Sequence, residues 1–119
     1  MKEGIVLFAH GSSDPQWSRP FEQIALSLQK KLPAVVVALA FLEHGTSLEE
    51  AVAALAAKGA ASIKVVPVFF GQGGHVKQDL PALMAAARRA FPQLDLMLET
   101  AIGENPNVIE AIAGAIAAR

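Results

Sequence analysis

Short runs of consecutive apolar residues alternate along the chain with longer stretches in which apolar residues recur every three or four positions. Continuous apolar runs of about four to eight residues are typical of strands covered on both faces of a sheet, and the longer spacing is typical of helices with one buried side. The pattern predicts four strand-then-helix repeats. The expected strands are residues 5–9, 35–41, 63–70 and 94–98.

Residues that favour helix ends lie between these runs. Thr46 to Glu49 predicts a capping box, Asn105-Pro106 predicts an N-cap followed by a first-turn proline, and Gly59 is placed to end the second helix. The first helix has two candidate starts, at residues 14–15 and 18–20, which a short turn before the main helix would accommodate. The fourth helix is expected to have an apolar side made of Val108, Ile109, Ile112, Ala113 and Ile116.

Alternation of strands and helices over short connections favours right-handed crossovers, and therefore an α/β fold with a mainly parallel sheet and helices on both faces. The simplest strand order is 2-1-3-4, with a topological switch point between strands one and three. Ligands of open α/β sheets bind there, outside the carboxyl ends of the strands. The length of 119 residues predicts one domain over residues 1–119.

Composition excludes several classes of function. A net charge of −1 offers no electrostatic footprint for nucleic acid or an anionic membrane, and the absence of cysteine excludes thiol catalysis and thiolate metal sites. We find no apolar run of membrane-spanning length and no signal-peptide pattern, so we expect a cytoplasmic protein. Charged residues make up 18% and apolar residues 53% of the chain, which suggests that some apolar surface is buried against a partner.

Histidines follow two of the expected strands. His10 comes directly after the first strand, and His75 follows the third across residues 71–74. Neighbouring strands lie about 4.8 Å apart, so the two imidazoles can share one ion at the switch point. Glu43 follows the second strand on the same edge. Two imidazoles and a carboxylate suit a divalent transition metal such as cobalt, nickel, iron or zinc.

Each of these residues also has a purely structural interpretation. His10 can donate to a loop carbonyl, His75 can be a solvated ring at a helix start, and Glu43 can be an exposed loop carboxylate. Their joint position at the switch point makes a shared site about as plausible as unrelated structural roles. His44 adds a third imidazole, which either joins the site or points to water.

The glycine-rich connection at residues 71–74 lets the backbone approach a ligand and directs free amides at an anion, although a tight turn explains part of it. It matches neither a Walker loop nor a dinucleotide fingerprint, so we expect no nucleotide. Two further kinds of donor are expected at the same edge. The small residues after the first strand offer backbone and hydroxyl donors, and two cationic side chains offer charged donors, although these cations can equally be solvated surface. Together they predict a flat, carboxylate-bearing ligand held by Gly11, Ser12, Ser13, Arg19, Gly73, Gly74 and Lys77.

Three motifs carry a resemblance that spans essentially the whole chain. They are FAHGS at residues 8–12, AFLE at 40–43 and PVFFGQGGHVKQDLP at 67–81, of which the last is the most specific. The chain resembles the sirohydrochlorin cobaltochelatase family of class II chelatases, in its short, single-domain form. That family inserts a divalent metal, cobalt or iron and in some members nickel, into sirohydrochlorin without ATP, in cobalamin or sirohaem biosynthesis.

The resemblance assigns roles to residues of this chain. It implies that His10 and His75 bind the metal substrate and that Glu43 occupies an acidic position at the cleft, where it is our candidate base for the pyrrole protons. His44 with Gly45 departs from the family pattern, which leaves the role of His44 open. The chain also lacks the histidine-rich tract of some nickel-associated members, which favours cobalt or iron.

Larger relatives hold two such halves in one chain, so the resemblance to short members implies a homodimer around a shared cleft. The apolar side of the fourth helix or the alanine-rich second helix is the expected contact. Two other functions remain possible: a non-catalytic carrier of a metal or a metallo-tetrapyrrole, and a flavodoxin-like phosphate-binding regulator. His10, and the absence of paired acids after strand one, argue against the regulator.

Overall fold

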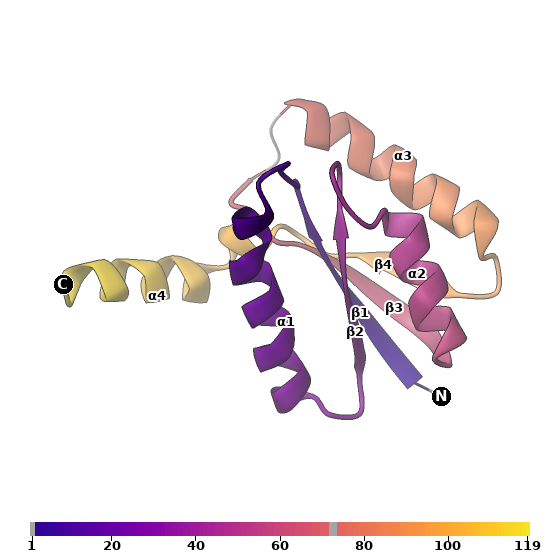
Figure 1. The fold of residues 1–119 in the computed structure, drawn as a ribbon, viewed down its shortest axis with the longest axis horizontal. Coiled ribbons are helices and arrows are strands. Elements are labelled where there is room, and N and C mark those ends of the chain that lie inside the picture. Colours follow the sequence, from indigo (N-terminus) through magenta and orange to yellow (C-terminus); the bar gives the residue numbers. More distant parts are fainter. Residues whose placement is uncertain (1, 72–73) are drawn as a thin grey trace.

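The computed structural model describes residues 2–71 and 74–119, and within these ranges the side chains of residues 74–77 are not described. Figure 1 shows the arrangement of its strands and helices. The strands are β1 (Lys2–Ala9), β2 (Val36–Phe41), β3 (Ala60–Pro67) and β4 (Asp95–Leu98). The helices are α1 (Arg19–Lys31), α2 (Leu48–Ala57), α3 (Gly74–Ala90) and α4 (Pro106–Ala117), with 3-10 turns at Pro15–Ser18 and Ile102–Glu104.

The four strands form one parallel sheet in the order β2-β1-β3-β4. In its register Ile5 of β1 lies opposite Val37 of β2 on one side and Lys64 of β3 on the other. The predicted fold class and strand order are therefore confirmed. The order places the switch point between β1 and β3, where the chain turns from winding one way to winding the other.

Some local boundaries differ from the sequence expectation, and β1 begins at Lys2, three residues earlier than predicted. The third strand begins three residues earlier than predicted and ends at Pro67, because its first residues pair with the start of β1. The capping box of α2 is one residue later than predicted: Ser47 is the N-cap and Glu50, not Glu49, completes the reciprocal pair. The sequence TSLEE satisfies the motif in both registers. The short turn before α1, the cap at Asn105, and Gly59 with its positive φ just after the C-cap of α2 agree with prediction.

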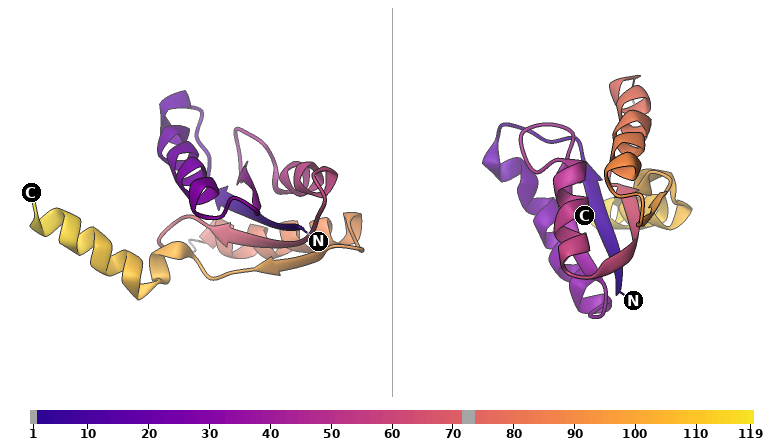
Figure 2. Two further views of the ribbon diagram at one scale, coloured as in Figure 1. Left: turned by 90° about the horizontal axis from the view of Figure 1, so that it is seen from below. Right: turned by 90° about the vertical axis from the view of Figure 1, so that its right-hand side faces the viewer.

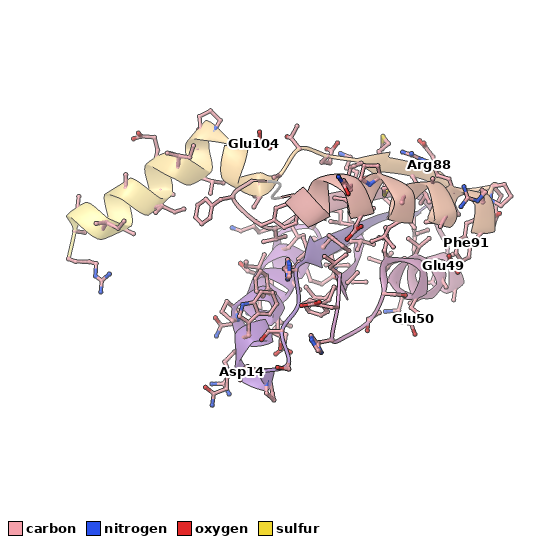
Figure 3. The ribbon with its side chains drawn as sticks, turned by 90° about the horizontal axis from the view of Figure 1, so that it is seen from above. Asp14, Glu49, Glu50, Arg88, Phe91 and Glu104 are labelled. Atoms are coloured by element: carbon pink, nitrogen blue, oxygen red, sulfur yellow. The ribbon has the colours of Figure 1, made fainter. Side chains whose placement is uncertain are left out.

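Helices cover the two faces of the sheet unequally, as Figure 2 shows. On the α2/α3 face, α2 and α3 pack on a sealed cluster that includes Phe8, Ile63 and Val65, each with no exposed surface. The Arg88 Nη2 donates to the Leu96 carbonyl at 3.0 Å and ties α3 to β4 (Figure 3). The opposite α1 face is covered by α1 over β1 and β2.

Helix α4 leaves the body of the molecule on the side of α1 and points away from the sheet (Figures 1 and 2). It packs against the turn Ile102–Glu104 from which it starts. Among the residues that the structure describes, we find no helix that is both long and apolar enough to cross a membrane.

Candidate functional site

The hydrogen-bond ladder between β1 and β2 continues past the ends of both strands. The Leu42 N–H donates to the Ala9 carbonyl at 2.9 Å, and the Glu43 N–H donates to the His10 carbonyl at 3.1 Å. Because the two strands are parallel neighbours, this continuation fixes His10 and Glu43 side by side at the carboxyl edge of the sheet. Their proximity is thus set by the backbone.

Gly11 allows the two segments to approach this closely. Its φ of +96° is unfavourable for residues with a side chain, and a Cβ at this position would collide with the Glu43 carbonyl oxygen. Gly11 was predicted from the sequence to help hold a ligand. The structure adds a packing requirement that only glycine meets.

The side chains of His10, Glu43 and His44 form an open cluster around one carboxylate oxygen. The Oε1 of Glu43 lies 3.8 Å from Nδ1 of His10 and 4.0 Å from Nε2 of His44, and about half of each side chain is exposed. These distances exceed hydrogen-bonding range, whereas Nδ1 of His10 lies 3.4 Å from the Gly11 carbonyl oxygen. The exposed half of each side chain leaves the cluster accessible to a ligand. Among the described side chains, no group of three or more metal-ligating residues is placed to hold an ion by itself.

His44 sits at the tip of a tight loop. Its φ of +58° is uncommon for a residue other than glycine, although histidine adopts this region more often than most. The loop closes through a 2.8 Å hydrogen bond from the Phe41 N–H to the Thr46 carbonyl, and Gly45 packs on the Phe41 ring, where a Cβ would lie 2.7 Å from Cδ2. This closure holds His44 next to Glu43.

A pocket of about 460 Å³ opens beside this cluster, on the α1 side of the strand ends. Two aromatic rings of its wall, Trp17 and Phe41, lie 6.2 Å apart between centroids, and Phe21 packs behind Trp17 at 4.6 Å. Polar atoms face the same space. The polar lining residues are Ser12, Ser13, Asp14, Ser18 and His44.

Part of this lining was predicted from the sequence. Ser12 and Ser13 were expected at the site, whereas Asp14, Trp17 and Phe41 were not. Two signals were available in the sequence. Trp17 is the single tryptophan of the chain and falls between the two candidate helix starts, and Phe41 ends a strand whose next residues include Glu43.

The structure describes only part of the remaining expected site residues. Helix α3 begins at Gly74, so His75 and Lys77 belong to its first turn, after the end of β3. Their side chains, and Gly73 as a whole, lie outside the described part of the structure. Arg19 is the exposed first residue of α1 and does not line the pocket.

Sequence comparison relates the chain to known proteins. A sirohydrochlorin cobaltochelatase from Methanosarcina acetivorans is 38% identical over 85 residues, which are 71% of this chain and 65% of that protein. The enzyme of the same name from Saccharolobus solfataricus is 39% identical over 82 residues, 68% of this chain and 62% of that protein. The chain therefore matches slightly less than two thirds of the length of these curated relatives.

Solved structures agree with this relationship. A protein described as a cobalamin biosynthesis CbiX protein, from Marinobacter aquaeolei VT8, matches with a TM-score of 0.84 and 30% identity over 96% of this chain and 93% of that one. The sirohydrochlorin chelatase SirB from Bacillus subtilis subspecies spizizenii, in complex with cobalt, matches with a TM-score of 0.84 and 26% identity over 98% of this chain but 50% of that one. The CbiX family model matches residues 4–118, so this chain belongs to the CbiX family.

Proposed function

We propose that this protein inserts a divalent metal, cobalt or iron, into sirohydrochlorin without ATP. The observation that carries the proposal is the pair His10 and Glu43, fixed side by side by the backbone at the carboxyl edge of the sheet next to an aromatic-walled pocket. The comparisons support it, because the curated relatives are sirohydrochlorin cobaltochelatases and SirB was solved with cobalt. The product would serve cobalamin synthesis with cobalt or sirohaem synthesis with iron.

In this proposal the metal substrate first binds to the neutral imidazoles of His10 and His75. An imidazole must present a free lone pair to a metal, so protons compete with the ion for the same nitrogen. Insertion is therefore expected to slow on acidification. Raising the metal concentration at low pH should restore part of the rate, which separates competition by protons from unfolding.

The macrocycle would then lie over the pocket. The rings of Trp17 and Phe41 offer apolar surface to a flat ligand, and the carboxylates of sirohydrochlorin would be held by Ser12 and the amides around Gly73 and Gly74, with Lys77 or Arg19 as cations. Ser13, at the rim of the same pocket, offers a further hydroxyl donor.

Metal insertion displaces two pyrrole protons. The Glu43 carboxylate would accept the first, and its exposure and its position beside His10 support this role. The second would pass to an imidazole that is freed when the metal leaves it for the macrocycle. In this sequence of steps the metal replaces the two pyrrole protons in the macrocycle, and no nucleotide is consumed.

The test is anaerobic insertion into sirohydrochlorin with each metal, followed by the change in its absorption spectrum. His10→Ala and His75→Ala should abolish insertion, and Glu43→Gln should slow it by about 10² to 10⁴ fold, the usual contribution of a general base. Glu49→Gln, an exposed carboxylate on α2, is the matched control. Wild-type rates in both folded histidine variants would overturn the proposal, whereas a wild-type rate in Glu43→Gln would remove the base role alone.

A non-catalytic carrier of the metal or of the metallated tetrapyrrole would use the same residues. The two functions differ in turnover, because a carrier yields at most one equivalent of metallated product per site. Multiple turnovers with excess sirohydrochlorin and metal would exclude the carrier.

We further propose that two copies of the chain form the complete cleft. The match to SirB covers half of that chain, which is what one half of a two-half protein would give. Sedimentation at increasing protein concentration tests this directly, and a single-copy species at all concentrations would contradict it.

A further inference from the structure

His44 belongs to the wall of the pocket beside the carboxyl edge, and the proposed steps of metal insertion do not use it. Its side chain lines the pocket together with the hydroxyls of Ser12 and Ser13 and the rings of Trp17 and Phe41. Among these described lining residues, His44 is the side chain that can carry a positive charge. The pocket therefore offers aromatic surface and hydrogen-bond donors to the same ligand.

The backbone brings His44 next to Ser12. In the register of β1 and β2, Ala9 lies opposite Phe41, and hydrogen bonds between the two loops continue this register beyond the strands. The same count, continued along both loops, sets Ser12 opposite His44. Neighbouring parallel segments lie about 4.8 Å apart, so donors from the two loops can reach one group of a ligand.

The hydroxyl of Ser12 has a proton to offer to such a group. Its Oγ accepts a hydrogen bond from the Asp14 amide at 3.1 Å, and this bond does not use the O–H. The hydroxyl of Ser18, in the same pocket wall, instead donates to the Pro15 carbonyl at 3.1 Å. Ser12 is therefore better suited than Ser18 to donate to a ligand.

The imidazole of His44 is a donor in either protonation state, through one N–H when it is neutral and two when it is charged. Its Nε2 lies 4.0 Å from Oε1 of Glu43, which is beyond hydrogen-bonding range, and about half of the side chain is exposed. The ring is thus held beside Glu43 without being bonded to it. It can donate to an acceptor that enters the pocket.

The size and chemistry of the pocket define the part of a ligand that fits. Its volume of about 460 Å³ is toward the lower end of the range for small-molecule sites, and a tetrapyrrole with its acidic arms is larger than this. One edge of the macrocycle fits instead, with a pyrrole ring against the aromatic wall. A carboxylate arm is the acceptor that suits two convergent donors, because bonds to an ionised acceptor are stronger than bonds to a neutral one.

We propose that His44 and Ser12 together bind one peripheral carboxylate of the tetrapyrrole. This inference rests on the proposed insertion into sirohydrochlorin and adds to it a substrate-binding role for His44. The arm is then anchored one residue away from Glu43, the carboxylate that receives a pyrrole proton in the proposed steps. Anchoring at this point sets how the macrocycle is turned over the site.

Binding of sirohydrochlorin can be measured without turnover, because Trp17 is the single tryptophan of the chain and lies in the pocket wall. Quenching of its fluorescence in the absence of metal gives the dissociation constant. His44→Gly, which suits the φ of +58°, should raise this constant at least tenfold, the usual loss for a hydrogen bond to a charged group. Thr46→Ala, an exposed residue of the same loop that does not line the pocket, is the matched control and should leave the constant near the wild-type value.

A lysine at position 44 separates a carboxylate contact from a metal ligand. Protonated lysine is a cation with three donors and no lone pair to offer to a metal. His44→Lys should therefore restore most of the sirohydrochlorin affinity that His44→Gly loses. If His44→Gly instead loses cobalt binding measured without tetrapyrrole, and keeps the wild-type affinity for sirohydrochlorin, the proposal is overturned and His44 is a metal ligand.

A double variant tests whether the two residues hold the same arm. Ser12→Ala alone should also weaken binding, and Ser12→Ala with His44→Gly should raise the dissociation constant by less than the product of the two single effects. Independent effects would overturn the shared carboxylate. Wild-type sirohydrochlorin affinity in His44→Gly, with insertion intact, would overturn the inference and leave the proposed function standing. A wild-type protein that shows neither quenching nor insertion would overturn both.

Discussion

On the α2/α3 face of the sheet, successive side chains such as Val6, Phe8 and Val65 are completely buried beneath two helices. On the α1 face the strands β1 and β2 are covered, but Lys64 is exposed and Met97 is half-buried. The same strands supply both faces, so the difference lies in the helices. One face is completely covered within the chain, and the other is covered only in part by the described residues.

The largest expected effect compares a residue from each face. Phe8→Ala should lower the free energy of unfolding by about 3–5 kcal/mol, because it empties a sealed part of the core. Val66→Ala should cost about 1 kcal/mol or less in dilute single-copy protein, since its side chain is already partly exposed. Urea unfolding followed by circular dichroism measures both. Equal losses of unfolding free energy in the two variants at low protein concentration would mean that the two faces contribute equally to stability.

A second prediction concerns the carboxyl edge of the sheet, where the candidate site lies, and not either of its faces. Gly11→Ala should cost about 2–3 kcal/mol and reduce metal insertion, because the new Cβ must push the Glu43 carbonyl away. Gly59→Ala is the matched control: its φ of +97° is equally unfavourable, but its Cβ would meet just the Cδ of the Lys2 side chain at 3.8 Å. It should cost about 1 kcal/mol and spare insertion. Equal insertion rates in the two variants would contradict the role of Gly11.

The smallest expected effect on stability concerns two helix N-caps. One belongs to α2, which packs on the sheet, and the other to α4, which packs on its own starting turn. Ser47→Ala removes the cap of α2 and should lower the free energy of unfolding by about 1 kcal/mol. Asn105→Ala removes an equivalent cap from α4, which packs on its own starting turn. It should reduce helix content without moving the unfolding midpoint of dilute protein. A shift of that midpoint would show that α4 contributes to single-copy stability.

The cap of α2 also predicts a pH dependence. Hydrogen bonds from the Ser47 backbone and side chain hold the pKa of Glu50 below its ordinary value. A carboxyl whose pKa is lowered by folding stabilises the protein above its unfolded-state pKa, and this contribution is lost as the pH falls through the folded-state pKa. The difference in stability between wild type and Glu50→Gln should therefore narrow on acidification, because Glu50→Gln removes the titrating carboxyl itself. A constant difference across the acid range would assign the effect to other groups.

Much of the fold could be predicted because local patterns and chain handedness restrict it strongly. Continuous apolar runs identified the strands, and right-handed crossovers left the order 2-1-3-4 as the simplest solution. The edge of a parallel sheet likewise explains why His10 and Glu43 lie together. The roles assigned to these residues are a separate matter and stay predictions.

Other features depend on information that local patterns do not carry. Helical spacing showed that Ile109, Ile112 and Ile116 share a side of α4, but not which surface that side contacts. The aromatic wall formed by Trp17 and Phe41 depends on how two separate loops fold over one another. The capping box shifted by one residue because adjacent Thr and Ser precede adjacent Glu residues, and the choice between registers is made by packing.

The continued ladder between β1 and β2 has a consequence for motion at the site. Because the Glu43 amide is bonded to the His10 carbonyl, the two residues can separate only when that bond opens. The amide of a loop residue would then exchange with deuterium as slowly as those of the neighbouring strand, although its side chain is half exposed. A metal ion arriving at this edge would meet a carboxylate and an imidazole that are already held together, with little backbone entropy left to lose.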